Sequence, residues 1–576
     1  GAMWVEPDAN LSSGESLIRQ ILRGRQFMID EFGVTPRCVW LPDTFGYPAS
    51  LPQIFAKSGV EYFVTSKLSW NDTNRHPNDT FLWQGIDGSR IKSQLITTQK
   101  SEAPDHRTVY NSELTVSEVF GAWNRYEPKA LNDEILICYG HGDGGGGPTR
   151  DMVQRGKRLA RGVAGAPKVR LEGLSDFLGR LDQSFAARQD AFPVWVGELY
   201  LEYHRGTFTS VAKNKADNRS SERYLREAEF AASVAAMRAD ARYPAGDLQD
   251  MWDLVLINQF HDILPGTSIA SVYADSDADY ATVEKTLNAA GGLIEGALNA
   301  ACGDKDSLRL VNFTGQTRGA DLARFTAQQA EHGHALRIGE HIAPLQQILR
   351  ADGTQEWIAP VPALPAMGWV RADLTAEGAT DRKGPEVAPG RLENNHVRVR
   401  FDIKGEIISI YDKTRDRELL KAGQTANQLI AYEDKPLAYD AWDVDHYYDK
   451  KSWPLSEQPA KIEVAETGPH RAALRIERGY RGSRIVQVIS LGTTSAQLEF
   501  DTYVDWRERQ TFLKALFPLD LNVAEARAEV QFGHVTRPTH SNTSWDAARF
   551  EACMHRWVDM SEPDFGPAIL NDCKYG

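Results

Sequence analysis

The sequence lacks the features that mark secreted, membrane-spanning or zinc-ribbon proteins. Only five of its 576 residues are cysteine; they lie far apart, and none forms a CxxC pair. Such a set supports neither a disulfide framework nor a zinc ribbon, and it fits a reducing compartment. No apolar run reaches the roughly 18 residues that a membrane helix needs, and the first ten residues show no basic segment before an apolar one. We therefore predict a cytoplasmic protein with no membrane partner.

Basic residues are in deficit. The chain holds 65 Lys and Arg against 79 Asp and Glu, a formal net charge of -14. Such a chain repels nucleic-acid phosphates and anionic lipid, so we do not expect nucleic acid as a partner. The glycine run Gly144–Gly147 is not followed by lysine, so a phosphate loop of the form GxxxxGK[ST] is excluded as well. Neutral ligands and cations remain compatible with the composition.

The pattern of the chain changes along its length and predicts a multidomain protein. Residues 1–210 alternate between apolar strands and helical stretches, which favours an α/β domain with a mostly parallel sheet or a distorted β/α barrel. Residues 211–301 are rich in Ala, Glu, Arg and Leu, which predicts a three-helix bundle. Residues 302–388 and 389–576 alternate apolar and polar positions, which predicts a small antiparallel β domain and a larger β-sandwich. The Pro/Gly-rich stretch 375–390 is the expected joint between them.

Asp43 is the first candidate for chemistry. A strand is predicted over Cys38–Leu41, and a helix is predicted to begin at Ser50, with Pro52 in its first turn. Asp43 would then lie in the loop after the strand, where α/β proteins place catalytic groups. A nucleophile or metal ligand and a simple Asx-turn explain this position equally well.

Asp143 is the second candidate. It follows a predicted strand over Glu134–Gly140 and precedes the run Gly144–Gly147, whose glycines allow close approach of a ligand to the backbone. A flexible linker is the alternative interpretation. A linker between a strand and a helix is unusual, so we favour a functional loop.

Two further segments carry polar groups beside apolar ones. His261 and Asp262 are predicted at the end of an apolar helix, where a histidine more often complements the helix dipole than binds a ligand. The segment "GELYLEYHRGTFTS", which contains His204 and Arg205, alternates aromatic and hydrogen-bonding side chains. A sugar site needs both kinds of group, although a half-exposed strand shows the same pattern.

Together these stretches strongly resemble the α-mannosidases of glycoside hydrolase family 38, along nearly the whole chain and most of all the cytosolic and bacterial type. The resemblance is carried by "MWVEPDANLSSGESLIRQ", "WLPDTFGYPASLPQI", "TSKLSWNDTNRHPNDTFLWQGIDGS", "GDGGGGPT", "ELYLEYHRGT", "NQFHDILPGTSI", "LENNHVRVRFDIKGEIISIYDK" and "DAWDVDHYY". It implies a retaining exo-α-mannosidase that forms a mannosyl-enzyme intermediate. It also implies a divalent metal, most often zinc, that holds O2 and O3 of the sugar.

The resemblance also implies roles for individual residues. Asp43 matches the nucleophile and a metal ligand, Asp143 is the candidate acid/base, and His261 matches a second metal ligand. The residues expected to contact substrate are Phe45, Lys67, His204, Arg205 and Asp262. The implied partners are α-mannoside oligosaccharides, and a homo-oligomer is left open.

One departure from the family accompanies these agreements. Relatives carry a His-x-Asp metal-ligand pair upstream of the "WVEPD" region, and this chain begins at "GAMWVEPD". The resemblance therefore leads us to expect an internal fragment that lacks the first catalytic strand and the C-terminal end, and that could itself be inactive. Three alternatives stay open: a non-catalytic carbohydrate-binding relative, a mannosylglycerate hydrolase and a metal-dependent polysaccharide deacetylase. The deacetylase is disfavoured because it explains neither the helical bundle nor the long β region.

Overall fold

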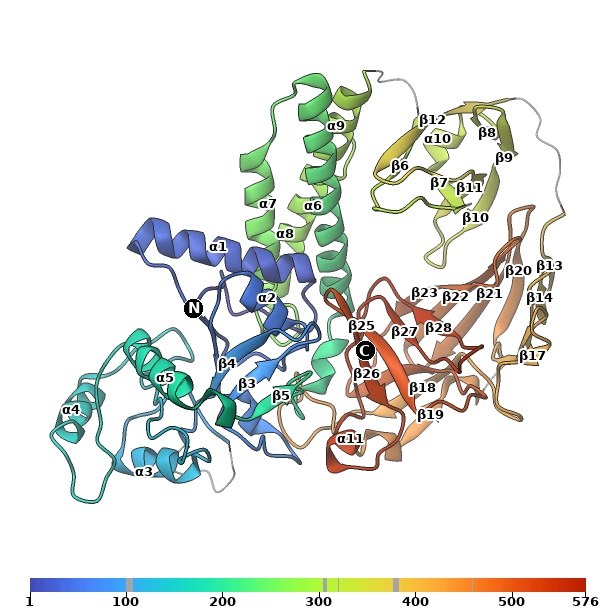
Figure 1. Cartoon of the computed structure of the whole chain (residues 1–576). Coiled ribbons are helices and arrows are strands. Elements are labelled where there is room, and N and C mark those ends of the chain that lie inside the picture. The colour runs from blue at the N-terminus through green and yellow to red at the C-terminus, as the bar shows by residue number, and fades with distance from the viewer. Residues whose placement is uncertain (100–106, 304–307, 320, 377–382, 458) are drawn as a thin grey trace.

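The computed structural model describes the chain except residues 100–106, 304–307, 320, 377–382 and 458. Four regions follow one another: an α/β region, a helical region, a small β region and a large β region (Figure 1). This order confirms the predicted fold class. Among the described residues, no helix is both long and apolar enough to cross a bilayer.

The α/β region is built on a five-stranded sheet with the order β1-β2-β4-β3-β5. Its strands are β1 (Cys38–Trp40), β2 (Tyr62–Thr65), β3 (Thr80–Gln84), β4 (Arg90–Leu95) and β5 (Val194–Val196). The pairs β1–β2, β2–β4 and β3–β5 are parallel, and β3–β4 is antiparallel. The sheet is open across the described residues, with β1 and β5 as its edges.

Helices cover this sheet and bury its apolar side chains. The helices of this region are α1 (Gly14–Phe32), α2 (Leu51–Lys57), α3 (Val116–Arg125), α4 (Arg150–Leu159) and α5 (Leu174–Arg188). Helices α1, α2 and α5 pack on the sheet, whereas α3 and α4 share a small core of their own. Helix α1 begins where the Ser13 side chain accepts the Ser16 N–H, and it ends at Gly33 in the left-handed conformation. One side of the sheet packs α1 and α2 around Phe55, Phe63 and Trp83, which are fully buried.

The helical region holds four helices rather than the predicted three. These are α6 (Ala212–Ala239), α7 (Ala245–Asn258), α8 (Ala270–Leu287) and α9 (Leu293–Cys302). The sequence pattern runs continuously through 279–298, but Gly291 takes a positive φ of 79° and separates α8 from α9. The bundle stands upright between the α/β and β regions in Figure 1.

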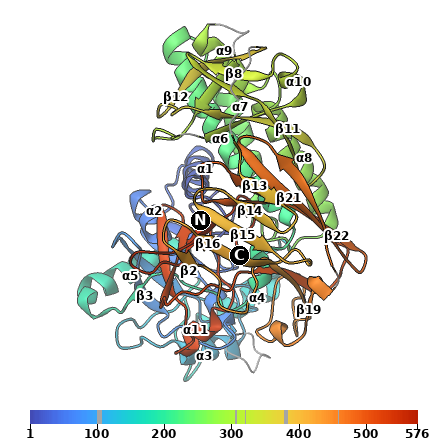
Figure 2. The same cartoon turned by 90° about the vertical axis from the view of Figure 1, so that its right-hand side faces the viewer.

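The small β region packs two antiparallel sheets against each other. Its elements are β6 (Leu308–Asn312), β7 (Asp321–Phe325), α10 (Ala327–Ala330), β8 (Ala335–Ile338), β9 (His341–Pro344), β10 (Gln346–Leu349), β11 (Gln355–Val361) and β12 (Gly368–Thr375). The sheet orders are β10-β11-β7 and β6-β12-β8-β9. Both figures place this region beside the α9 end of the bundle, away from the α/β region (Figures 1 and 2).

The large β region contains four antiparallel sheets, as the alternating pattern predicted. Their strands are β13 (Glu386–Ala388), β14 (Arg391–Glu393), β15 (Val397–Phe401), β16 (Ile407–Asp412), β17 (Arg417–Glu418), β18 (Gln428–Glu433), β19 (Ser452–Pro454), β20 (Lys461–Thr467), β21 (Arg471–Tyr480), β22 (Ser483–Gly492), β23 (Leu498–Asp505), β24 (Thr511–Leu516), β25 (Glu525–Val530), β26 (Gly533–Pro538), β27 (Trp557–Asp559) and β28 (Ala568–Leu570), with helix α11 (Ser544–Ala548). Side chains of β14–β16 and β21–β22 share one apolar core, as in a sandwich. The expected joint at 375–390 lies partly outside the described residues, and the expected boundary at 388 falls within the β13–β14 hairpin.

The sheet β26-β25-β27-β28 returns to the α/β region at the end of the chain, where the C label of Figure 1 lies. Gln531 Nε2 donates to the carbonyl oxygens of Ala9 and Ser12 at 2.8 and 2.9 Å. Arg537 forms an ion pair with Glu198 at 2.9 Å. Hydrogen bonds and an ion pair between residues far apart in the sequence thus join the α/β region to the large β region.

The predicted strand over Glu134–Gly140 is wrong. This segment is irregular and makes one isolated parallel bridge, between Tyr139 and Ser112. Its apolar side chains, among them Leu136 and Cys138, pack against α5 and its neighbours without a ladder of strand hydrogen bonds. Tertiary packing here satisfies the apolar pattern that a strand would otherwise explain.

Candidate active site

Parallel strands bring Asp43 and Lys67 together. Cys38 of β1 pairs with Tyr62 of β2. Asp43 and Lys67 follow these paired residues by the same number of positions, so both lie at the carboxyl ends of their strands. Lys67 Nζ donates to Asp43 Oδ1. The Ser66 hydroxyl donates to the Pro42 carbonyl at 2.8 Å and holds the two loops side by side. At this edge of the sheet, the Asp43 carboxylate is therefore paired with the Lys67 ammonium group.

Tyr110 connects Asp43 to Asp143. Its hydroxyl lies 2.9 Å from Asp43 Oδ2 and 2.5 Å from Asp143 Oδ1. Asn111 Nδ2 donates to the other oxygen of Asp143 at 3.3 Å. Burial, followed by the charge of Asp43, raises the pKa of Tyr110, so the phenol remains protonated at neutral pH. The two carboxyl groups predicted from sequence are thus joined through a residue that the sequence did not single out.

His261 reaches the site from beyond the end of α7, which stops at Asn258. Its backbone N–H donates to the Glu6 carbonyl at 3.0 Å, which ties this loop to the segment before α1. The ring Nδ1 lies 3.1 Å from the same carbonyl, and Nε2 lies 3.8 Å from Asp43 Oδ2. A carbonyl oxygen can only accept, so Nδ1 is the donor in this contact, and Nε2 is the ring nitrogen that faces Asp43.

Glu6 holds the backbone of the loop that contains Asp43. Its Oε1 accepts the backbone N–H groups of Asp43 at 2.6 Å and Thr44 at 3.1 Å. Burial raises the pKa of Glu6. Because its carboxyl group is committed to the backbone, Glu6 orients the loop that carries Asp43 rather than facing a ligand.

Asp262 receives a contact from the large β region. Its Oδ1 accepts the Thr267 hydroxyl at 2.7 Å and the Trp442 indole N–H at 3.1 Å, while Oδ2 lies 3.6 Å from His261 Nε2. Asp262 therefore sits beside the two groups assigned to the metal, with about a third of its side chain exposed. The loop that contains Trp442 completes this side of the site.

Phe45 and His204 form an apolar wall next to these polar groups. The Phe45 ring packs edge-on against His204, with centroids 4.9 Å apart, and Lys67 Nζ lies 5.1 Å over the Phe45 ring. Burial, then the charges of Lys67, Arg107 and Arg205, lowers the pKa of His204 well below its usual value. The imidazole is therefore neutral at physiological pH.

Arg205 lies behind the site. Its guanidinium donates to Asp72 at 3.2 Å and to the Ala548 carbonyl at 3.1 Å, and it stacks over the Phe550 ring at 4.2 Å. The backbone N–H of Arg205 donates to Asp443 at 3.2 Å. These contacts commit Arg205 to joining the α/β and large β regions.

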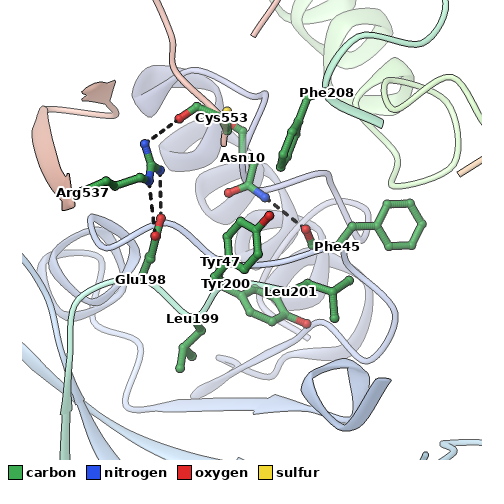
Figure 3. Close-up of a pocket in the computed structure, with 10 residues that line it drawn as sticks. All are labelled: Asn10, Phe45, Tyr47, Glu198, Leu199, Tyr200, Leu201, Phe208, Arg537 and Cys553. Atoms are coloured by element: carbon green, nitrogen blue, oxygen red, sulfur yellow. Dashed lines mark hydrogen bonds and ion pairs between the residues drawn. The ribbon is translucent and has the colours of Figure 1, made fainter. Parts of the chain in front are cut away.

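A small internal pocket lies behind Phe45, at the junction of the two halves of the chain (Figure 3). Asn10 Nδ2 donates to the Phe45 carbonyl at 3.0 Å, and the Phe45 ring points away from the pocket. Arg537 and Glu198 close another side through their ion pair. The pocket is lined by Asn10, Phe45, Tyr47, Glu198, Leu199, Tyr200, Leu201, Phe208, Arg537 and Cys553. Its contacts are internal, so it fixes the backbone of Phe45 and does not extend the candidate site.

Comparison with known proteins accounts for most of the chain. Residues 1–198 match the glycosyl hydrolases family 38 N-terminal domain, residues 202–296 match the alpha mannosidase middle domain, and residues 392–576 match the glycosyl hydrolases family 38 C-terminal domain. The chain belongs to glycoside hydrolase family 38.

Curated members of family 38 align with the entire chain. Alpha-mannosidase 2C1 of Homo sapiens is 36% identical, over 100% of this chain and 52% of that protein. Alpha-mannosidase of Saccharomyces cerevisiae is 33% identical, over 100% of this chain and 50% of that protein. The chain spans about half the length of these relatives. The crystal structure of an alpha-mannosidase from Enterococcus faecalis V583 superimposes with a TM-score of 0.75 at 16% identity, over 99% of this chain and 72% of that chain, which shows the shared fold.

The resemblance to family 38 implies a divalent metal, and two residues here suit one. His261 Nε2 and Asp43 Oδ2 are atoms of the types that bind zinc, and Nδ1 of His261 is held by a carbonyl, as ligand histidines often are. A zinc site usually takes three or more protein ligands. Within the described part of the chain, no group of three or more His, Cys, Asp or Glu side chains is arranged to hold a metal. The two donors fit a metal but do not complete a site.

The sequence did not identify three residues of the candidate site: Glu6, Tyr110 and Trp442. Glu6 and Trp442 lie within "WVEPD" and "DAWDVDHYY", which carried the resemblance but had no assigned role. Tyr110 lies outside every motif that carried the resemblance. Its position depends on Thr108, which bonds to Ser66 and Ser69 beside Lys67.

Proposed function

We propose that the chain hydrolyses terminal α-linked mannose with retention of configuration, through a mannosyl intermediate on Asp43. The observation that carries this proposal is the bridge through the Tyr110 hydroxyl. Carboxyl oxygens of Asp43 and Asp143 lie 2.9 and 2.5 Å from the same oxygen atom. Their separation cannot exceed the sum of these two contacts, which is below the roughly 6.5–9.5 Å typical of inverting enzymes.

The surroundings of the two carboxyl groups support different roles for them. Asp43 holds the Lys67 ammonium group on one oxygen and keeps the other for attack on the sugar. Asp143 is exposed and contacts Tyr110 and Asn111, and we assign it the role of the acid.

These roles suit the two steps of retaining hydrolysis. In the first step Asp43 attacks the anomeric carbon while Asp143 gives its proton to the departing glycosidic oxygen, which forms the mannosyl-Asp43 ester and frees the aglycone. In the second step Asp143 takes a proton from water, which attacks the same carbon and releases mannose from Asp43. Lys67 remains paired with the other oxygen of Asp43 throughout.

In this proposal the other predicted site residues bind the substrate or support the residues that bind it. Phe45 offers its ring to the mannose, and Asp262 offers carboxylate oxygens to sugar hydroxyls. His204 supports Phe45, and Arg205 positions the loops behind the site. A divalent ion on Asp43 and His261, zinc by the resemblance, would orient the 2- and 3-hydroxyl groups of the sugar. The cytoplasmic location stays a prediction from the sequence.

The experiment is to incubate the protein with aryl α-mannosides and with α-mannobioses, and to follow the anomer of the first product by NMR. We expect α-mannose as the first product. A fluorinated mannosyl inhibitor should label Asp43, and Asp43→Asn should reduce turnover by more than a thousandfold while the protein remains folded.

Labelling of another carboxylate would refute the assignment of Asp43, and β-mannose as first product would refute retention. Mannose binding with no turnover of any mannoside would favour the non-catalytic relative. Faster release of mannose from 2-O-mannosylglycerate than from mannobiose would favour the mannosylglycerate hydrolase.

A further inference from the structure

A row of basic side chains follows one face of α4. Between residues 150 and 170 the sequence holds seven Arg and Lys against one acidic residue, Asp151, although the whole chain has a net charge of -14. Arg150, Lys157 and Arg161 are separated by seven and four positions, so they lie along one side of a helix, and Arg158 lies next to them. Arg161 comes just after α4, where its N–H donates to the Arg158 carbonyl at 3.1 Å and continues the turn. We call these four residues the basic stripe.

The charges of the basic stripe are open to solvent. All four residues are exposed, and none of their side chains forms an ion pair or a hydrogen bond with another described residue. Two neighbouring cations differ in this respect, because Arg155 pairs with Glu113 at 3.7 Å and Arg170 pairs with Glu134 at 2.7 Å. Figure 1 shows α4 at the edge of the molecule, away from the helical bundle and from both β regions. The basic stripe is therefore a positive surface that a partner can reach.

The opposite face of α4 is already occupied. Met152, Gly156 and Leu159 are buried, and Leu159 packs with Leu114 and Val119 in a small core. Helix α4 therefore has no free apolar face to place in the groove of a partner or in a lipid bilayer, as amphipathic binding helices do. Any contact at this surface is made through the cations.

Helix stability alone does not explain the basic stripe. On α1, Arg19 pairs with Glu15 four positions away at 2.8 Å, which stabilises a helix. Helix α4 instead leads from Lys157 to Arg161 at the same spacing, where like charges repel each other. The helix dipole favours a cation in the last turn, which accounts for Lys157, but it disfavours Arg150 at the first position. An anion bound along the stripe would relieve this repulsion.

The size of the basic stripe indicates which anion fits it. The positions from Arg150 to Arg161 span about 16 Å at a helical rise of about 1.5 Å per residue. An extended peptide covers this length with about five residues. A nucleic-acid duplex or an anionic bilayer is much larger, and it would also face the acidic surface of a chain whose net charge is -14. A short acidic peptide segment meets the cations without meeting the rest of that surface.

We propose that the basic stripe docks a short acidic segment of a partner protein, a stretch of about five residues rich in Glu and Asp. One exposed cation contributes little, but several neighbouring cations act together and direct the encounter with an oppositely charged partner. The loop that contains Asp143 ends at Thr149, the N-cap of α4, so the partner would be held next to this loop. The docking uses no residue of the candidate active site and goes beyond the proposed function.

The test uses fluorescein-labelled hexaglutamate as the probe, titrated with the whole protein and followed by fluorescence anisotropy. We expect binding at low salt that weakens at physiological salt, because screening acts on exposed charges. Lys157→Glu/Arg161→Glu should weaken binding about tenfold, and Lys157→Gln/Arg161→Gln should weaken it less, since a neutral side chain adds no repulsion. The matched control, Arg226→Glu/Lys285→Glu, reverses two exposed cations of the helical region and should bind like the wild type. Circular dichroism checks that each variant is folded.

Absence of hexaglutamate binding at low salt, or equal affinities in Lys157→Glu/Arg161→Glu and wild type, would overturn the proposal. So would tighter binding of a single-stranded oligonucleotide or of phosphatidylserine vesicles that is lost in the same variant, since the stripe would then serve another polyanion. Self-association of the wild type that this variant abolishes, measured by light scattering, would make a second copy the occupant and would also refute it. Hydrolysis of mannosides does not enter the test, so its result is independent of the proposed function.

Discussion

At the scale of single residues, the two carboxyl groups of the proposed site differ in what they contact. Asp43 holds an ammonium group on one oxygen and faces a phenol with the other, whereas Asp143 is exposed and meets Tyr110 and Asn111. Two residues of the same chemical type thereby acquire different environments. Such a difference separates a nucleophile from an acid in retaining glycosidases.

Asp143→Ala tests the acid role. We expect kcat on mannobiose to fall by about 10²–10⁴, the usual contribution of a general acid. Hydrolysis of 2,4-dinitrophenyl α-mannoside should fall much less, because its leaving group departs without a proton. Steady-state kinetics on both substrates measure this difference. Asp151→Ala, an exposed carboxylate at the start of α4, is the control, and equal losses on the two substrates for Asp143→Ala would contradict the assignment.

Tyr110→Phe tests the bridge. Removal of the hydroxyl takes a hydrogen-bonding partner from both carboxyl groups and frees them to reorient. We expect kcat on mannobiose to fall about 10- to 100-fold, less than the loss caused by removal of the acid itself, with an unchanged melting temperature. Tyr139→Phe removes a nearby phenol hydroxyl that makes no described contact with Asp43 or Asp143 and should retain full activity. Wild-type kinetics in Tyr110→Phe would show that the bridge has no part in turnover.

At the scale of elements, short loops after strands do most of the positioning. The helix predicted after Ser50 and the strand predicted at Cys38 are both present as α2 and β1, since their apolar pattern, proline and glycine signals agree with one another. The loop after β18 carried no such signal. It is held by Asp443, whose Oδ1 accepts the backbone N–H groups of Arg205 at 3.2 Å and Val444 at 3.0 Å.

We expect the substitution Asp443→Asn to change how the stability of the protein depends on pH. Burial raises the pKa of Asp443 to about 7; Arg205 opposes the rise, and Asp72 and Asp445 add to it. An acid with a raised pKa in the fold releases its proton more readily when unfolded, so stability decreases as pH rises from about 4 to 7. One pKa unit is worth about 1.4 kcal/mol, so the carboxylate costs on the order of a few kcal/mol at pH 8.

The asparagine keeps an oxygen for both N–H groups and removes the charge. Its melting temperature should equal or exceed that of the wild type at pH 8, and this advantage should shrink toward pH 4. Thermal unfolding across this range measures it, with the exposed neighbour Asp440→Asn as control. A destabilisation of equal size at all pH values would contradict the prediction.

At the scale of the whole molecule, segments far apart in the chain meet at the proposed site and at the junction behind it. Trp442 is hydrogen-bonded to Asp262 across 180 residues of sequence, and Arg537 is hydrogen-bonded to Glu198 across 339. The sheet β26-β25-β27-β28 therefore contacts the α/β region, although its strands lie in the large β region of the sequence. Figure 1 shows it in red, close to the blue α/β region.

Glu198→Gln tests this junction. Glu198 is mostly buried between Arg537 and Arg549, and its loss leaves two cations without a counter-charge. We expect a destabilisation of about 3–5 kcal/mol at neutral pH, as for other broken buried ion pairs, seen as a lower unfolding midpoint in urea. Glu61→Gln, which breaks the exposed pair with Arg37, should cost less than about 1 kcal/mol.

The pH profile adds an independent check. Burial alone would raise the pKa of Glu198, but the charge and hydrogen bond of Arg537 lower it below the usual 4.5. This contribution to stability is present above pH 4.5 and is lost as the pH falls through the lowered pKa. The difference in the free energy of unfolding between wild type and Glu198→Gln should therefore become smaller at acidic pH. A difference that stays constant with pH would contradict the electrostatic explanation.

The sequence by itself determined the order of the regions, the strand and loop that carry Asp43, and the resemblance to family 38. Apolar periodicity and turn residues report local burial and local conformation, so β1, α2 and α7 could be placed from them. Tertiary structure alone decided that 134–140 is not a strand, that Tyr110 bridges Asp43 and Asp143, and that Trp442 stands beside Asp262. These are contacts between segments distant in the chain, and their geometry depends on how whole regions pack, which no local pattern encodes.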